Sequence, residues 1–206
     1  MSVSGQILVM ESARSSRRKP ESLARLKASA RKLFIERGYD ATRPQDIARG
    51  AGLGHGTFYL HYPDKRACFL AFIQDARQEL DNHLQSRRAQ DSNLEQSIAA
   101  FLTAIYDYAD SHPGVLRAAM SDERIIDAEG VETEPLLALW GAQWAVMVRG
   151  LAKSSIVCSS YDADIAGQAI AGALHQAGRE SHRSARSRDV LVKNLTAFLT
   201  RALKPA

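Results

Sequence analysis

The chain has 206 residues, and its formal net charge of +4 conceals an uneven distribution, because residues 1–66 carry 13 basic and 6 acidic side chains whereas residues 67–206 carry 14 and 17. This length suits a small domain joined to a larger one, and a basic segment beside a mildly acidic one is typical of a polyanion-binding head, although ordinary variation in surface charge also fits. The most apolar stretch, Leu136 to Val148, is shorter than the ~20 residues that a membrane span needs, and the first ten residues lack the pattern of a secretory signal, so we expect neither a membrane span nor a signal. With two cysteines outside any ligand spacing, we expect a cytoplasmic protein with reduced thiols and no membrane partner.

The N-terminal residues 1–20 are rich in Ser and Arg and end in a basic run before Pro20. Because this stretch has little apolar content, we expect a flexible basic arm. From Ser22 onward, apolar residues recur at intervals of three and four up to Gly38. This spacing predicts a helix that the glycine ends.

Two much shorter helices are predicted next, over about 44–51 and 55–62, separated by Gly52, Leu53 and Gly54. A helix-turn-helix requires two short helices, a tight turn and apolar residues that hold the second helix outward. Phe58 and Tyr62 lie four residues apart and are expected to anchor the second helix in the core. Its outer side is then polar and aromatic, which is typical of a helix that enters the major groove of DNA.

The remaining chain is predicted to be helical throughout, so the expected fold class is all-α. A three-helix helix-turn-helix domain over 21–66, with its motif at about 43–62, precedes a larger helical bundle over 67–206. A break at Pro63 and Asp64 starts a long amphipathic helix predicted over about 65–88. Further helices are predicted at Leu94–Asp110, Pro113–Glu123, Glu134–Lys153, Asp162–Arg183 and Ala185–Leu203.

The segment from Arg25 to Phe69 contains many residues that match one known sequence pattern, in register and without an insertion or deletion. These positions are Ala30, Leu33, Phe34, Gly38, Tyr39, Thr42, Asp46, Ile47, Ala48, Ala51, Gly52, Gly56, Thr57, Phe58, Tyr59, His61, Tyr62, Asp64 and Lys65. With them the segment resembles the TetR family of transcriptional regulators. The resemblance implies a regulator of transcription that binds double-stranded DNA. The sequence has no nucleophile elbow, phosphate loop or metal-ligand spacing, so together with the DNA-binding motif we expect a protein that is not an enzyme and has no cofactor and no metal.

The expected set of DNA-contacting residues, taken in part from the resemblance, is Thr42, Arg43, Gln45, Gly54, His55, Gly56, Thr57, Tyr59, His61 and Lys65. In it, Thr42, Lys65 and the hydroxyl of Tyr59 contact phosphates, and Gly56 and Thr57 lie against the DNA. His61 has two readings, as a phosphate contact or as a packed structural histidine.

Other members of this set either occupy base-reading positions or depart from the family pattern. Gln45 and His55 stand where bases are read. Arg43, followed by Pro44, replaces a capping threonine and adds a phosphate or minor-groove contact, and Gly54 replaces the serine cap of the recognition helix. The basic arm before Pro20 either follows the minor groove or stays a solvated tail.

The C-terminal domain is expected to bind a small-molecule effector and to form a homodimer. Candidate ligand contacts are the aromatic and sulfur side chains Phe101, Tyr106, Tyr108, Met120, Trp140, Trp144 and Met147, although plain core packing also explains each of them. The resemblance implies a dimer interface from the last two helices, at Ile165, Ala169, Ala173, Val190, Leu191, Leu195 and Phe198.

A ligand-released repressor on a near-palindromic operator is the mechanism that follows from these expectations, because two recognition helices related by a twofold axis enter successive major grooves. Two alternatives stay open. One is an activating or ligand-independent DNA-binding regulator, and the other is a helical module that binds protein instead of DNA.

Overall fold

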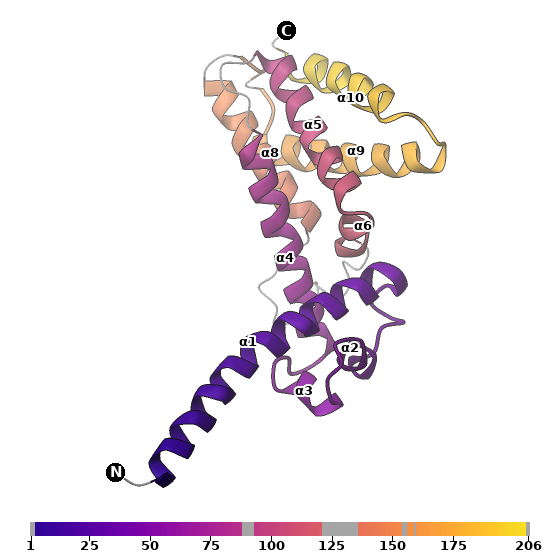
Figure 1. The fold of residues 1–206 in the computed structure, drawn as a ribbon. Coiled ribbons are helices and arrows are strands. Elements are labelled where there is room, and N and C mark those ends of the chain that lie inside the picture. The colour runs from indigo at the N-terminus through magenta and orange to yellow at the C-terminus, as the bar shows by residue number, and fades with distance from the viewer. Residues whose placement is uncertain (1–2, 88–92, 121–135, 154–155, 159, 205–206) are drawn as a thin grey trace. The chain divides into compact units, whose positions relative to one another are not determined.

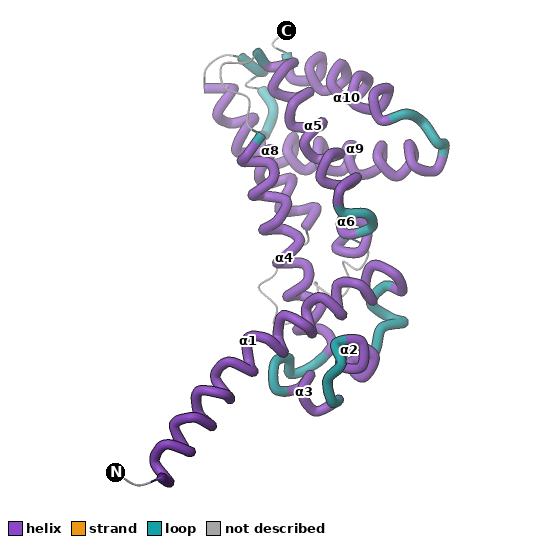
Figure 2. Tube along the Cα trace, viewed as in Figure 1, coloured by secondary structure: helices purple, strands orange, loops and turns teal. Residues whose placement is uncertain are grey.

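The computed structural model describes residues 3–87, 93–120, 136–153, 156–158 and 160–204, and these ranges contain helices and no strand (Figures 1 and 2). The helices are α1 (Val3–Arg37), α2 (Pro44–Gly50), α3 (His55–Tyr59), α4 (Lys65–Ser86), α5 (Leu94–Ser111), α6 (Val115–Ala119), α8 (Leu136–Lys153), α9 (Ala163–Arg183) and α10 (Arg188–Leu203). The all-α fold class is therefore confirmed. None of the described helices is both long and apolar enough to cross a membrane.

The chain divides into two compact units. One comprises Met1–Asp75 and Arg117–Asp122, and the other comprises Ala76–Leu116 and Glu123–Ala206. The first unit extends beyond the 21–66 domain expected from the sequence because the start of α4 packs into its core. Phe69 meets the ring of Phe34 edge-on, with ring centroids 5.0 Å apart.

Helix α1 begins at Val3, which corrects the expectation of an arm without regular structure over residues 1–20. Starting a helix is costly, whereas adding residues to an existing one is easy when they have reasonable helix propensity. The segment before Pro20 consists mostly of such residues, and Pro20 itself lies inside the helix. The composition of the terminal segment did not indicate that the helix predicted from Ser22 extends back to Val3.

The core of the first unit is made of apolar side chains from all of its first four helices. The largest fully buried ones are Leu26, Phe34, Ile47, Phe58, Phe69 and Ile73. The predicted anchors of α3 are confirmed, because Phe58 and Tyr62 are both buried and their ring centroids lie 5.6 Å apart. Burial on this scale holds α3 rigidly, since aromatic side chains contribute large apolar areas.

In the second unit, α8 and α9 pack closely along their length, and α10 packs against α5. Gly141 and Gly167 make the approach of α8 and α9 possible: a Cβ atom at Gly167 would lie 2.2 Å from the carbonyl oxygen of Gly141. The start of α10 is tied to α5 by Arg188, which forms ion pairs with Asp107 and Asp110. Leu195, Leu199 and Leu203 of α10 are buried.

Candidate nucleic-acid interface

The helix-turn-helix is built from α2, a glycine turn and α3. Pro44 occupies the first turn of α2 after Arg43, whose backbone is extended and whose side chain forms no capping bond. Gly52 has a φ of +65°, a left-handed conformation that favours glycine. Gly54 precedes α3, also without a side-chain cap. Both departures from the family pattern therefore leave their helix starts without a side-chain cap.

One face of α1 holds this motif through three hydrogen bonds, which sequence reasoning missed. The Oγ atom of Ser22 lies 2.7 Å from Nε2 of His61, Arg25 donates to the carbonyl oxygen of Gly52 at 3.2 Å, and Ser29 donates to the carbonyl oxygen of Ile47 at 2.8 Å. Residues three and four apart lie on the same side of a helix, so these three polar side chains form one row. The signal available in the sequence was the spacing of these polar residues by three and four, next to the apolar residues of the same predicted helix.

Small residues in the motif allow α1 to come this close. A Cβ atom at Gly50 would lie 2.4 Å from Oγ of Ser29, and one at Gly52 would lie 2.6 Å from a guanidinium nitrogen of Arg25. Contacts this short do not occur between real side chains and their neighbours. The glycines on either side of Ala51 therefore serve the packing of α1 as well as the turn.

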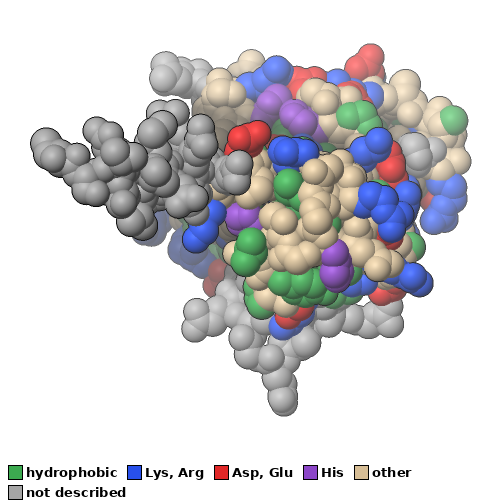
Figure 3. All heavy atoms as spheres, turned by 60° about the horizontal axis from the view of Figure 1, so that its bottom comes forward, with side chains coloured by type: hydrophobic (Ala, Val, Ile, Leu, Met, Phe, Trp, Pro, Cys, Tyr) green, Lys and Arg blue, Asp and Glu red, His purple; other side chains and the backbone are tan. Residues whose placement is uncertain are grey.

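The outward side of α2 and α3 gathers most of the residues expected to contact DNA. Arg43, Gln45, Gly54, His55, Gly56 and Tyr59 are exposed, and Thr57 is half-buried. The Tyr59 side chain is 50% exposed and meets the ring of His55 edge-on at 5.2 Å between centroids. Seen from the side of α2 and α3, the surface mixes basic and His side chains with hydrophobic ones (Figure 3). Leu60, which follows α3, is 76% exposed on this part of the chain and was not expected there.

Thr42 is a correction to the expected set, because its side chain is completely buried. Its Oγ1 donates to the carbonyl oxygen of Gly38 at 2.7 Å, with the carbonyl of Leu33 at 3.3 Å. These carbonyls lie at the end of α1, where helical acceptors have no partner further along the helix. Thr42 therefore closes the C-terminal end of α1 and does not present its hydroxyl to a phosphate.

Lys65 and His61 are also held by the protein itself. The Lys65 ammonium donates to the carbonyl oxygens of Tyr39 and Asp40 at 2.9 and 3.5 Å and lies 4.0 Å from the centre of the Tyr39 ring. His61 is half-buried and bonded to Ser22, as a packed structural histidine would be. A phosphate contact by either side chain stays a prediction.

The expected ligand-contacting residues are dispersed between core and surface. Met120 is assigned to the first unit, whereas the other six belong to the second. Tyr108 is buried and donates its hydroxyl to Glu79 at 3.1 Å, so it is a core residue with its polar group in use. Burial raises the pKa of Tyr106 to about 12. Trp140 is buried, and Phe101 and Met147 are half-buried.

Trp144 has a feature that core packing alone does not explain. Its side chain is almost fully buried against Phe101, with ring centroids 4.8 Å apart. The indole Nε1 is buried without a hydrogen-bond acceptor among the described residues. Because buried donors are normally paired, this nitrogen is suited to an acceptor that the chain does not supply.

The residues expected in the dimer interface also differ in their exposure. Ile165, Val190 and Phe198 are large exposed hydrophobic residues, Ala169 is exposed, and Ala173 and Leu191 are half-buried. Leu195 is a correction, because it is only 8% exposed and belongs to the core of its own chain. Since α10 packs on α5, the side of α10 that carries Leu195 is covered already.

The comparisons with known proteins agree with this geometry. Residues 26–72 match the family model for bacterial regulatory proteins of the tetR family. The nucleoid occlusion factor SlmA of Glaesserella parasuis is 26% identical over 113 residues, 50% of this chain and 56% of that protein. The HTH-type transcriptional regulator EthR of Mycobacterium tuberculosis is 26% identical over 119 residues, 57% of this chain and 53% of that protein. The chain thus spans about half the length of these curated relatives.

The fold is shared over nearly the whole chain with solved structures of low sequence identity. The transcriptional regulator FadR of Bacillus subtilis, solved in complex with stearoyl-CoA, has a TM-score of 0.68 and 15% identity over 86% of this chain and 97% of its own. The family match falls on the helix-turn-helix and its supporting helices, and the shared fold extends to the helical second unit. Residues 26–72 therefore carry the sequence pattern of the bacterial regulatory proteins of the tetR family, and the fold of the chain is similar to that of a solved transcriptional regulator.

Proposed function

We propose that the protein is a homodimeric repressor that binds a near-palindromic operator and leaves it when a small molecule binds the second unit. The observation that carries the DNA-binding part is the outward side of α3. Tyr59 and His55 are exposed there, while Phe58 and Tyr62 hold the helix from behind. A rigid helix with a polar and aromatic outer side matches the requirements for contact with phosphates and base edges.

Selection from a random pool of duplex DNA with the unmodified protein tests this part directly. We expect enrichment of one sequence with two similar half-sites about 34–36 Å apart, because twofold symmetry requires this spacing. A pool that stays random at low ionic strength would contradict DNA recognition. The enriched duplex then serves as the operator in the experiments below.

The Tyr59 hydroxyl is proposed to contact a phosphate. Tyr59→Phe should weaken operator binding by roughly tenfold, the effect expected when a hydrogen bond to a charged group is lost. Tyr161→Phe is a matched control, because Tyr161 is 51% exposed but belongs to the second unit. Equal binding by the Tyr59 variant and the wild type would remove this contact from the proposal.

Arg43 is proposed to neutralise a phosphate. Arg43→Ala should then reduce the slope of log affinity against log salt concentration by about one, because one fewer counterion is released. Lys153→Ala removes the same charge from the exposed end of α8 in the second unit and should leave the slope unchanged. An unchanged slope for the Arg43 variant would place Arg43 away from the DNA backbone.

Exposed apolar side chains on α9 and α10 support the homodimer. Ile165 is 72% exposed and Phe198 is 58% exposed. Phe198→Glu should shift the protein toward the monomer in sedimentation velocity and weaken operator binding. Val146→Glu is the control, since Val146 is also highly exposed but lies on α8 outside the proposed interface. If both variants stay dimeric, another surface forms the dimer.

The unpaired indole nitrogen of Trp144 supports an effector site near Phe101 and Trp144. Because the FadR structure contains stearoyl-CoA, this compound is the first one to test. The ligand must bind the two conformations of the dimer with different affinity in order to release DNA. Operator affinity is measured with and without stearoyl-CoA, in the wild type and in Trp144→Phe, which keeps an aromatic ring at this position but lacks the N–H donor. If the operator affinity of the wild type is the same with and without stearoyl-CoA, this compound is not the effector.

A further inference from the structure

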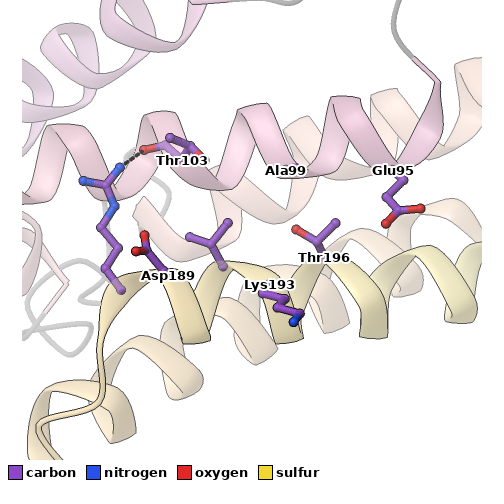
Figure 4. A pocket seen from close by; sticks show the side chains of 8 residues that line it. Glu95, Ala99, Thr103, Asp189, Lys193 and Thr196 are labelled. Carbon is purple, nitrogen blue, oxygen red and sulfur yellow. Dashed lines mark hydrogen bonds between the residues drawn. The ribbon is translucent and has the colours of Figure 1, made fainter.

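A groove with a volume of about 280 Å³ lies between α5 and α10 in the second unit (Figure 4). Its lining residues are Glu95, Ala99, Thr103, Arg188, Asp189, Val192, Lys193 and Thr196. None of them belongs to the residues discussed above as contacts for DNA, the effector or a second subunit. The groove is therefore a separate feature of the molecule and lies outside the function proposed above.

Thr196 is the first sign that this groove has an occupant. The residue is only 6% exposed, and its Oγ1 is buried without a hydrogen-bond partner in the described part of the chain. Buried hydroxyl groups are normally paired, because they lose their bonds to water without replacement. The hydroxyl of Thr196 lines the groove and lies on the side of α10 that faces α5 (Figure 4). A polar group in the groove would satisfy it.

The charges around the groove favour a cation. Arg188 is already matched, because it forms ion pairs with Asp107 and Asp110, and Asp107 also pairs with Arg87. Asp189 and Lys193 on α10 also line the groove, and neither forms an ion pair with the described residues. Glu95 on α5 has no ion-pair partner among the described residues. Apart from Arg188, the lining therefore carries two carboxylates, Glu95 and Asp189, and one ammonium, Lys193, which leaves an excess of one negative charge.

The side chains of Glu95 and Thr196 lie toward the same end of the groove (Figure 4). Asp189 and Thr103 lie toward the other end, Ala99 lies on α5, and Lys193 lies on α10 between Thr196 and Asp189. Ala99 and Val192 supply apolar surface in the lining. The groove thus combines a negative group, a hydroxyl and an apolar wall.

We propose that this groove binds a small organic amine, with its ammonium group at Glu95 and Thr196 and its apolar body against Ala99 and Val192. The carboxylate of Glu95 accepts a hydrogen bond from the ammonium, and Oγ1 of Thr196 accepts a second one. A charged donor makes such bonds stronger than those of a neutral alcohol. The site therefore distinguishes ligands by their charge.

Benzylamine, benzyl alcohol and benzoate test this proposal, because they share a ring and differ in charge. Each is titrated into the full-length ¹⁵N-labelled protein, and backbone shifts in α5 and α10 are followed by NMR. We expect saturable binding of benzylamine, binding of benzyl alcohol weaker by roughly tenfold, and no binding of benzoate. Equal binding of the amine and the alcohol, or absence of amine binding at millimolar concentration, would overturn the proposal.

Variants of the two polar groups complete the experiment. Glu95→Gln and Thr196→Val should each weaken benzylamine binding, the first by roughly tenfold. Circular dichroism checks that both variants are folded. Glu36→Gln is the matched control, because it removes the same charge from an exposed position in the first unit. Unchanged benzylamine affinity in the Glu95 variant would show that the amine binds elsewhere. Since no DNA is present, these results are independent of operator binding.

Discussion

Ser22 on α1 and His61 after α3 are joined by a side-chain contact of 2.7 Å between Oγ and Nε2, although 39 residues separate them in the sequence. The contact is partly buried and connects the first helix of the unit to the end of the recognition helix. It therefore restricts how α3 can turn relative to α1.

Removing either partner should lower the stability of the protein. Ser22→Ala is expected to reduce the free energy of unfolding by about 1 kcal/mol, the net contribution of an ordinary hydrogen bond. In the His61→Ala background the same change should have little further effect. Urea unfolding of the full chain and a double-mutant cycle measure this coupling, and strictly additive effects would show that the contact contributes nothing.

Thr42→Val tests whether this residue is structural. Valine has nearly the same shape but cannot donate to the carbonyl oxygens of Gly38 and Leu33. We expect a loss of about 1–3 kcal/mol in the free energy of unfolding, because buried acceptors lose their partner. Operator affinity per folded molecule should be unchanged.

Thr57→Val provides the contrast, because Thr57 is half-buried on α3 and forms no side-chain bond that stabilises its helix start. It should weaken operator binding and leave the stability nearly unchanged. A Thr42 variant of normal stability that binds the operator weakly would restore the phosphate contact for Thr42.

The close contact of α8 and α9 makes Gly167 sensitive to substitution. In Gly167→Ala, the new methyl group would meet the backbone of Gly141 and Ala145, so the two helices must separate. Overpacking of this kind costs about 1–3 kcal/mol or more. Gly172→Ala lies on the same helix with no atom within 4 Å of the added Cβ, and should be neutral or slightly stabilising. Thermal unfolding compares the two, and equal melting temperatures would contradict the packing described for α8 and α9.

Asp107 should make stability dependent on pH. Its hydrogen bond with Arg188 is the main reason that the pKa of its carboxyl is lowered. A carboxyl whose pKa is lower in the folded state stabilises the protein above its ordinary pKa of about 3.9, and this contribution is lost as the pH falls through the folded-state pKa. Asp107→Asn should therefore lower the melting temperature most at neutral pH, with a difference that shrinks in acid.

A control for this experiment is Asp164→Asn, which removes an exposed ion pair with Arg149. Exposed pairs contribute little, so this variant should have nearly the melting temperature of the wild type at every pH. An Asp107 variant with a constant difference across the acidic range would show that its effect does not depend on ionisation.

The two cysteines should differ in reactivity. Burial raises the pKa of the Cys68 thiol to about 12, whereas hydrogen bonds with Ser160 lower the pKa of the Cys158 thiol. Because the thiolate is the reactive form, a thiol-specific disulfide reagent should modify Cys158 in the native protein and Cys68 only after unfolding. Cys158→Ser should abolish the rapid reaction of the native protein with this reagent. Two equally fast thiols would mean that the environment of Cys68 opens readily.

The sequence predicted most of the helices because their boundaries carry local signals. Asn93, Asp162 and Ser187 each accept a backbone hydrogen bond at the start of a helix, and α5, α8, α9 and α10 begin within a few residues of the predicted positions. The first helix was harder to predict. A terminal segment of polar composition continues α1 because a helix is already present, and composition alone contains no such information.

The parts of the site that depend on the spacing of apolar residues could be predicted from the sequence. The parts that depend on individual hydrogen-bond partners were harder to predict. Phe58 and Tyr62 followed from periodicity, whereas the roles of Thr42 and Lys65 depend on carbonyl oxygens at the end of α1 and in the following loop. A resemblance to a family transfers residue types but not the partners that hold their side chains. Leu195 was wrongly expected in the dimer interface, because an apolar stripe on a helix does not reveal that α5 covers this residue.

The row formed by Ser22, Arg25 and Ser29 has an evolutionary consequence. Two of its three bonds end on main-chain oxygens, at Gly52 and Ile47, which every amino acid possesses. Mutations that alter the outward side chains of α2 and α3 leave these acceptors in place. Under the proposed function, new DNA-sequence preferences arise by substitution of these outward side chains, while the hydrogen bonds that hold α2 and α3 against α1 are inherited intact.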